Sequence, residues 1–197
     1  ERVDGLFTSG DVRRRGDALV FVYKAAAEIG ELGDNTAALR ATIAGDALLA
    51  AALRGPEAEV MVVGHTRWAS IGIISEPNAH PQVSDEPSRP EAPLVTAVLN
   101  GDVDNFADLI VAEDLEIHHL VTTDAKVIPT MVSRRVAAGE EPGSAFRETV
   151  AALEGSVAIA AHTVDAAQPG RLHLALRGSG QALYVGVADD CYIVASE

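Results

Sequence analysis

The chain has 197 residues, of which 48% are apolar, so it is long and apolar enough to fold as one globular domain around a real core. Its net charge of −14 argues against nucleic acid as a partner, because phosphate binding needs a basic face. No apolar run approaches the roughly 18 residues that cross a bilayer, and a single cysteine excludes an internal disulfide. We therefore expect a cytoplasmic domain that binds a small molecule or another protein.

The first half of the chain predicts strands separated by helices. Residues 18–23 are rich in β-branched and aromatic side chains and predict a buried strand. Residues 34–55 are rich in Ala and Leu and predict two short helices, with Gly45 between them. Two further apolar runs, at 59–65 and 93–102, predict strands.

The second half predicts helices first and strands last. Helical patterns cover residues 104–113, 124–138 and 142–153. The strand-like runs that follow are separated by Gly, Pro and Asp, which is typical of an antiparallel meander; they cover 155–164, 171–178, 182–187 and 191–197. Strands and helices in separate blocks predict a layered α+β domain rather than a doubly wound parallel sheet.

Three features are candidates for a binding or catalytic site. Arg67 and Trp68 end an apolar run and could clamp a carboxylate with a planar guanidinium, or could be an Arg stacked on a Trp at the surface. The pair Asn100 and Gly101 could donate hydrogen bonds to an oxyanion, or could form a hairpin turn. Asp124 could pair with an ammonium group, or could cap the helix that it opens.

The histidines and the cysteine do not predict a metal or cofactor site. None of the six histidines has a partner at His-x-x-x-His spacing or a cysteine companion. Cys191 falls inside the last predicted strand, beside Tyr192, and is expected to be a buried small residue.

Several segments taken in order resemble one family. The stretch "GHTRWAS" followed by "SEPNAHP" is similar to the signature of the class II glutamine amidotransferase domain of the glutamine–fructose-6-phosphate aminotransferases, also called glucosamine-6-phosphate synthases. "LNGDVDN", "TTDAKVI" and the closing strand runs resemble further segments of that domain. The resemblance extends from about Glu59 to the end of the chain.

This resemblance implies an N-terminal-nucleophile (Ntn) hydrolase-like αββα sandwich, with two antiparallel sheets between helix layers. It implies a glutaminase that releases ammonia for transfer to fructose 6-phosphate, in which a cysteine at the mature N-terminus attacks the glutamine amide. Glu1 is the first residue here. We therefore expect residues 1–197 to be a single type-2 domain in a fragment that lacks its N-terminal Cys strand and a C-terminal sugar isomerase (SIS) domain. Such a fragment would be inactive alone; the alternative is a glutamine-binding or regulatory module without catalysis.

The resemblance also implies roles for residues that bind substrate. Arg67 would hold the α-carboxylate of L-glutamine, and Asp124 would hold its α-ammonium. The loop through Ser70 and Gly72 would close over the ligand, and Trp68 would gate the passage of ammonia.

Asn100, through its side chain, and Gly101, through its N–H, would form the oxyanion hole. The chain departs from the family pattern at Ile71 and Leu99, where histidine is usual, and at Lys126, where an acidic residue is usual. The partners implied are the sugar isomerase domain of the same parent chain and a second copy in a homodimer.

Overall fold

The computed structural model describes residues 6, 8–26, 33–56, 58–67, 70–164 and 170–196. Its helical elements are α1 (Asp34–Gly45), α2 (Ala47–Ala52), α3 (Phe106–Ala112), the 3-10 helix η1 (Asp124–Lys126), α4 (Val127–Ala137) and α5 (Pro142–Ala152). Its strands are β1 (Asp11–Arg15), β2 (Ala18–Val22), β3 (Gln82–Val83), β4 (Val95–Val103), β5 (Gly155–Thr163), β6 (Leu172–Arg177), β7 (Tyr184–Val187) and β8 (Tyr192–Ala195). No helix in the described ranges is long and apolar enough to cross a membrane.

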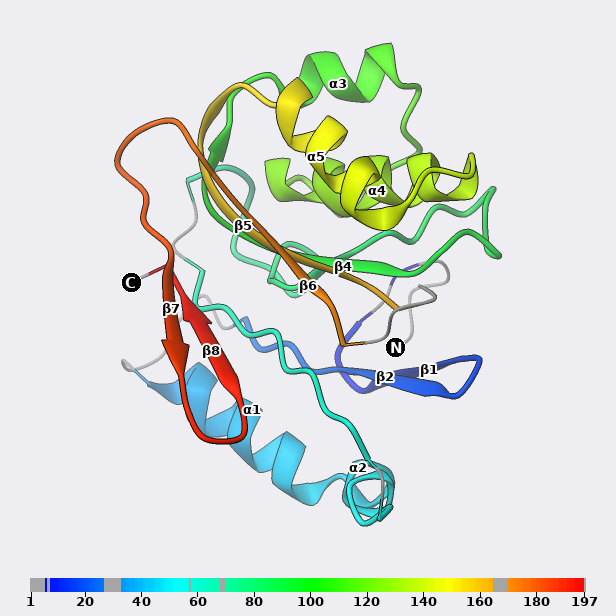
Figure 1. The fold of residues 1–197 in the computed structure, drawn as a ribbon, viewed down its shortest axis with the longest axis vertical. Helices are drawn as coiled ribbons and strands as arrows, with labels where there is room; N and C mark the ends of the chain where they lie inside the picture. Colours follow the sequence, from blue (N-terminus) through cyan, green and yellow to red (C-terminus); the bar gives the residue numbers. More distant parts are fainter. Residues whose placement is uncertain are drawn as a thin grey trace.

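An antiparallel sheet of four strands, in the order β3-β4-β5-β6, forms the centre of the fold. Helices α3, α4 and α5 cover one face of this sheet, and the hairpins β1–β2 and β7–β8 lie on its other side (Figure 1). Helices α1 and α2 lie beyond β1–β2 (Figure 1). The order of the layers is therefore helices, sheet, hairpins and helices.

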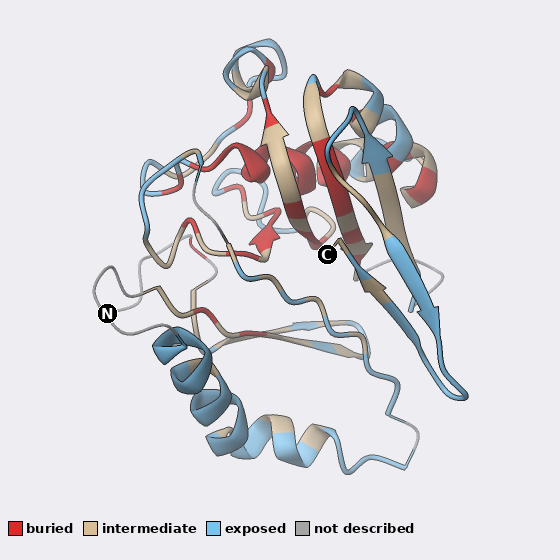
Figure 2. Ribbon diagram, turned by 90° about the vertical axis from the view of Figure 1, so that its left-hand side faces the viewer, coloured by how far each residue is buried: buried red, intermediate tan, exposed pale blue. Residues whose placement is uncertain are grey.

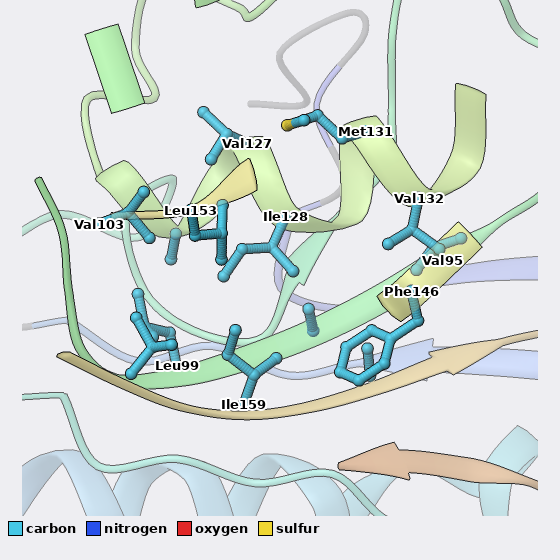
Figure 3. Close-up of a cluster of buried hydrophobic side chains, with 14 of the residues drawn as sticks. Val95, Leu99, Val103, Val127, Ile128, Met131, Val132, Phe146, Leu153 and Ile159 are labelled. Atoms are coloured by element: carbon cyan, nitrogen blue, oxygen red, sulfur yellow. The ribbon is translucent and has the colours of Figure 1, made fainter. Parts of the chain in front are cut away.

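The main core lies between α4, α5 and the central sheet. Val127, Ile128, Met131 and Val132 of α4 are all buried, none of them more than 2% exposed, and Ile128 points at the sheet (Figure 3). Ile159 in β5 points towards Ile128 from the sheet side and belongs to the same buried cluster (Figure 3). Burying a side chain of this size fully contributes about 1.5–3 kcal/mol, so this contact fixes α4, and η1 before it, against β4.

The hairpins and the first two helices are far less buried than the central sheet. No residue of α1 or α2 is buried, and both helices are mainly exposed in Figure 2. Every residue of β7 is exposed, including Tyr184 and Val187. The stability of the fold therefore comes mainly from the central sheet and its helices.

Most of the predicted elements are present, with one clear exception. The predicted strand at 59–65 is wrong: this segment has no sheet partner, although its residues alternate between exposed and partly buried as in an extended strand. The final four strands are also not one meander, because β5 and β6 join the central sheet and β7 and β8 form a sheet of their own. The second predicted sheet is thus present as two separate hairpins.

Candidate functional site

Asn100 and Gly101 lie inside β4, so the hairpin-turn alternative for this pair is wrong. Gly101 has φ of 120° and pairs with Val157 of β5. A Cβ added to Gly101 would lie 1.9 Å from the carbonyl oxygen of Ser156, so only glycine fits at this position. Asn100 Nδ2 donates a hydrogen bond to Ser196 Oγ at 3.1 Å, which fixes the orientation of the amide.

Asp124 joins η1 to β4 close to that pair. Its side chain is only 4% exposed, and Oδ2 accepts the backbone N–H of Val103 at 2.7 Å. The hydroxyl of Thr123 donates to Oδ1 at 3.3 Å, and Thr123 is the N-cap residue of η1. Burial raises the pKa of Asp124, and the Val103 N–H partly offsets this by favouring the ionised form. The site thus contains a buried carboxylate that is bonded to β4 at Val103, two residues after Gly101 in the sequence.

Arg67 lies within electrostatic reach of Asp124. Its guanidinium is partly buried and donates to the carbonyl of Ile73 at 3.3 Å and to the carbonyl of Ile71. Burial lowers the pKa of Arg67, and the charge of Asp124 opposes that shift. Arg67 remains a cation in proteins at any ordinary pH, so the site presents one positive and one negative group.

The loop after Arg67 packs against both β4 and the segment before Asp124. The hydroxyl of Ser70 donates to the carboxylate of Asp102 in β4. Gly72 has φ of 83°, and a Cβ there would lie 2.9 Å from Thr122 Oγ1. Trp68 is outside the described residues. Of the predicted site residues, the structure therefore brings together Arg67, Ser70, Gly72, Asn100, Gly101 and Asp124.

The sequence pattern predicts no role for Asn78, which lies in the stretch "SEPNAHP". Its side chain is fully buried. Nδ2 donates to the Ile73 carbonyl at 3.0 Å and to Thr122 Oγ1 at 2.9 Å. Oδ1 accepts the N–H groups of Thr122 at 2.7 Å and Thr123 at 3.2 Å. The only signal in the sequence was the position of an amide between a loop and a strand.

A group of buried titratable side chains lies next to the site. Burial lowers the pKa of His80 to about 3, with smaller contributions from His65 and Arg67, so this imidazole is neutral. The rings of His65 and His80 are 4.3 Å apart. Burial also lowers the pKa of Lys24 to about 8, and Lys126 contributes to that shift. Lys126, which stands where the family resemblance leads one to expect an acidic residue, donates to the carboxylate of Asp85.

The cysteine does not lie where the sequence predicted it. Cys191 is exposed rather than buried, and it precedes β8 in the turn that joins β7 to β8. Its carbonyl accepts the N–H of Ala188 at 2.9 Å, which closes this turn. Among the described residues there is no grouping of three His, Cys, Asp or Glu side chains that could hold a metal ion.

Comparisons with known proteins show which proteins this chain resembles. No family model matches the chain. The glutamine–fructose-6-phosphate aminotransferase (isomerizing) of Bacillus thuringiensis subsp. konkukian is 36% identical over 136 residues, which are 68% of this chain and 21% of that protein. The protein of the same name from Mesorhizobium japonicum is 37% identical over 101 residues, 50% of this chain and 15% of that protein. The matched part is thus between 15% and 21% of the length of these curated relatives.

A solved structure with a similar fold is the glutamine phosphoribosylpyrophosphate (PRPP) amidotransferase from B. subtilis, complexed with ADP and GMP. It aligns with a TM-score of 0.52 and 20% identity over 67% of this chain and 26% of that chain. At this identity the likeness concerns the fold alone. The chain therefore shares the layered α+β fold of that amidotransferase, and the predicted α+β class with antiparallel sheets is confirmed.

Proposed function

The chain is homologous, over two thirds of its length, to part of the glutamine–fructose-6-phosphate aminotransferases, and we propose that it is their glutamine-handling domain. In this role it binds L-glutamine and stabilises the attack on the side-chain amide. The ammonia released would serve the synthesis of glucosamine 6-phosphate from fructose 6-phosphate.

The observation that carries this proposal is the approach of Arg67 to Asp124 beside β4. An α-amino acid bears a carboxylate and an ammonium group on one carbon, so its recognition needs one cation and one anion close together. The guanidinium fork of Arg67 suits the carboxylate, and the buried carboxylate of Asp124 suits the ammonium. The same pair would discriminate against ligands that lack either charge.

The amide end of the ligand would reach β4. The side chain of Asn100 and the backbone N–H of Gly101 are then the donors for the oxyanion that forms when the amide carbon is attacked. The bond from Asn100 to Ser196 uses one of its two amide N–H groups and leaves the second for the ligand. Ser70 and Gly72 belong to the loop that would cover the bound amino acid, and Trp68 would border the exit for ammonia.

The two candidate functions, a glutaminase and a glutamine-binding module, differ in whether a nucleophile is present. The one cysteine in the sequence, Cys191, is exposed in the β7–β8 turn. It is five residues from Ser196 along an extended strand, which corresponds to roughly 16 Å, whereas Ser196 contacts Asn100. We therefore infer that a cysteine nucleophile would come from sequence outside this chain. This observation also favours the second candidate function, a glutamine-binding or regulatory module without catalysis.

The curated relatives are far longer than the matched part, and we infer that the chain works within a longer protein. Its partners would be a sugar isomerase domain of the same polypeptide and a second copy in a homodimer, in the cytoplasm. Such an arrangement would let ammonia pass directly from this domain to the sugar phosphate.

Calorimetric titration of L-glutamine into this chain tests the binding proposal. We expect saturable binding, and we expect Arg67→Ala to weaken it by 10- to 150-fold, because a hydrogen bond to a charged group contributes about 1.5–3 kcal/mol. The matched control is Arg40→Ala, which removes an exposed arginine from α1. Equal affinity in the two variants would contradict the role of Arg67.

An ammonia-release assay on the full-length protein from the native gene distinguishes the two functions. Glutamine-dependent release that disappears on treatment with a thiol-alkylating reagent, in both the full-length protein and its Cys191→Ser variant, supports the enzyme. Glutamine binding without ammonia release supports the binding module. Retained activity after alkylation would contradict a cysteine nucleophile.

A further inference from the structure

The side chain of Asn78 is saturated with hydrogen bonds. A primary amide has two donors and an acceptor with two lone pairs. Asn78 uses all four: it donates to the Ile73 carbonyl and Thr122 Oγ1, and it accepts from the N–H groups of Thr122 and Thr123. The amide is fully buried, so each of these bonds is costly to lose.

These bonds connect the two charged groups of the candidate site. On one side, the Ile73 carbonyl accepts both from Asn78 Nδ2 at 3.0 Å and from Arg67 at 3.3 Å. On the other side, Thr123 bonds Asn78 through its N–H and Asp124 through its hydroxyl. A continuous path of hydrogen bonds thus runs from Arg67 through Asn78 to Asp124.

The path is supported by close packing. Gly72 lies against Thr122 so tightly that a Cβ on Gly72 would meet the Thr122 carbonyl carbon and oxygen at 3.0 Å. Asp124 is in turn fixed to β4 by the Val103 N–H. The hydrogen bonds that Arg67 makes within the described part of the chain go instead to the carbonyls of Ile71 and Ile73 in its own loop. Asn78 therefore provides the side-chain connection between that loop and the segment that carries Asp124.

We propose that Asn78 is a positioning residue that holds Arg67 at a fixed distance from Asp124, so that the carboxylate and the ammonium of one amino acid are bound together. The proposal rests on the proposed function of this site. Asn78 does not touch the ligand. It acts through the Ile73 carbonyl on Arg67 and through Thr123 on Asp124.

The chemistry of the amide is what this role requires. Aspartate at 78 would keep the two bonds from the Thr122 and Thr123 N–H groups. It would lose both donors and would place a carboxylate oxygen against the Ile73 carbonyl, so the loop that carries Arg67 would be released. The segment before Asp124 would stay in place. Asn78→Asp is therefore expected to separate the two halves of the site without removing either charge.

The test compares three ligands on the wild-type chain and on Asn78→Asp by NMR titration. L-glutamine carries both charged groups, glutaramate lacks the ammonium, and γ-aminobutyramide lacks the carboxylate. We expect Asn78→Asp to weaken L-glutamine at least tenfold and to change the affinity for each single-charge ligand by less than threefold. Loss of folded protein would instead weaken all three ligands by one common factor. If the NMR spectrum shows that the variant is folded, a common factor or no change overturns the proposal.

A matched control is Asn105→Asp. Asn105 makes the same kind of bridge at another place, donating to the Ala152 carbonyl at 3.0 Å and accepting the Glu154 N–H at 2.9 Å. The Asn105→Asp variant should leave the affinities for all three ligands unchanged. If Asn78→Asp does not fold, Asn78→Ala removes the same bridge without adding a charge, and the same selective loss is expected.

A measurement without ligand separates this proposal from the proposed function. Hydrogen exchange at the Arg67 guanidinium Nη–H groups and at the Val103 backbone N–H reports on the two halves of the site in the free protein. In Asn78→Asp we expect the Arg67 signal to shift or exchange at least tenfold faster, with Val103 unchanged. If the wild-type chain binds no glutamine but this change occurs, the positioning role stands and the proposed function fails. If Arg67 is unchanged, the positioning role is overturned whatever the chain binds.

Discussion

Replacing Gly101 by alanine should disrupt the central sheet at the proposed oxyanion hole. Gly101 has φ of 120°, a conformation that residues with a Cβ rarely adopt. The added Cβ would lie 1.9 Å from the Ser156 carbonyl oxygen and 2.9 Å from its carbonyl carbon. Both are backbone atoms of β5, so no side-chain rotation can relieve the contact. β4 and β5 would have to separate by about 1.5 Å to reach an ordinary contact distance of 3.4 Å.

The cost follows from two separate effects. Holding an alanine at this φ costs about 1–3 kcal/mol. Opening the strand pair to admit the methyl group costs a further 1–3 kcal/mol or so, as overpacking in other cores does. The expected loss is therefore about 2–6 kcal/mol, a large part of the 5–15 kcal/mol that is typical of a whole domain.

Urea denaturation followed by circular dichroism measures this loss. Gly186→Ala in β7 is the matched control, because a Cβ there would lie 3.6 Å from the nearest atom, the Ile193 carbonyl oxygen, at an ordinary contact distance. We expect the control to change the free energy of unfolding by less than about 1 kcal/mol. If Gly101→Ala were as stable as Gly186→Ala, the close approach of β5 at this position would be wrong.

Three further predictions concern charge and packing. Burial lowers the pKa of Lys24 from 10.5 to about 8, so the native state holds fewer protons than the unfolded state between these values and stability should rise with pH across that window. In Lys24→Met, the free energy of unfolding should no longer rise with pH across this window. At pH 7 the variant should be more stable than wild type by up to about 3 kcal/mol in urea denaturation. A variant less stable than wild type would contradict the burial of a charged Lys24. Burial raises the pKa of Asp124, so glutamine affinity, measured by calorimetry against pH, should fall on acidification at a higher pH than an ordinary aspartate would give, and a flat profile would contradict a role for its charge. Ile128→Ala should cost about 2–5 kcal/mol, whereas Val111→Ala, at a residue that is 81% exposed, should change thermal stability little; equal effects would contradict the core described above.

The sequence predicted the helices and the central strands because their local patterns agree with their environment. The run that became β4 and the helical pattern that became α4 both face one core, so their apolar spacing matches their burial. The strand expected at 59–65 failed for the opposite reason. Its apolar side chains suit a strand, but a strand needs a hydrogen-bonding neighbour, and the pattern of one segment cannot specify a neighbour. Val62 is 82% exposed as a result.

The sequence predicted which residues form the candidate site, but not the strand pairing and hydrogen bonds that join them. Asn100 and Gly101 look like a turn when read as a dipeptide, and only the pairing of β4 with β5 places them inside a strand. Asp124 opens a helix as expected, yet its carboxylate bonds Val103 of β4, 21 residues away in the sequence. Asn78 has no local signal for its role, because its partners are defined by the approach of two distant segments. Cys191 was expected to be buried, but the hairpin that contains it has no covering layer among the described residues.

The most direct test of the central claim is to map glutamine binding on the chain by NMR. Backbone amide shifts recorded during titration with L-glutamine should move at Gly72, Gly101, Val103 and Thr123, and those of α1 should not move. This result would place the ligand between the loop after Arg67 and β4, as the account requires. Shifts confined to other parts of the chain, or none at millimolar glutamine, would contradict it.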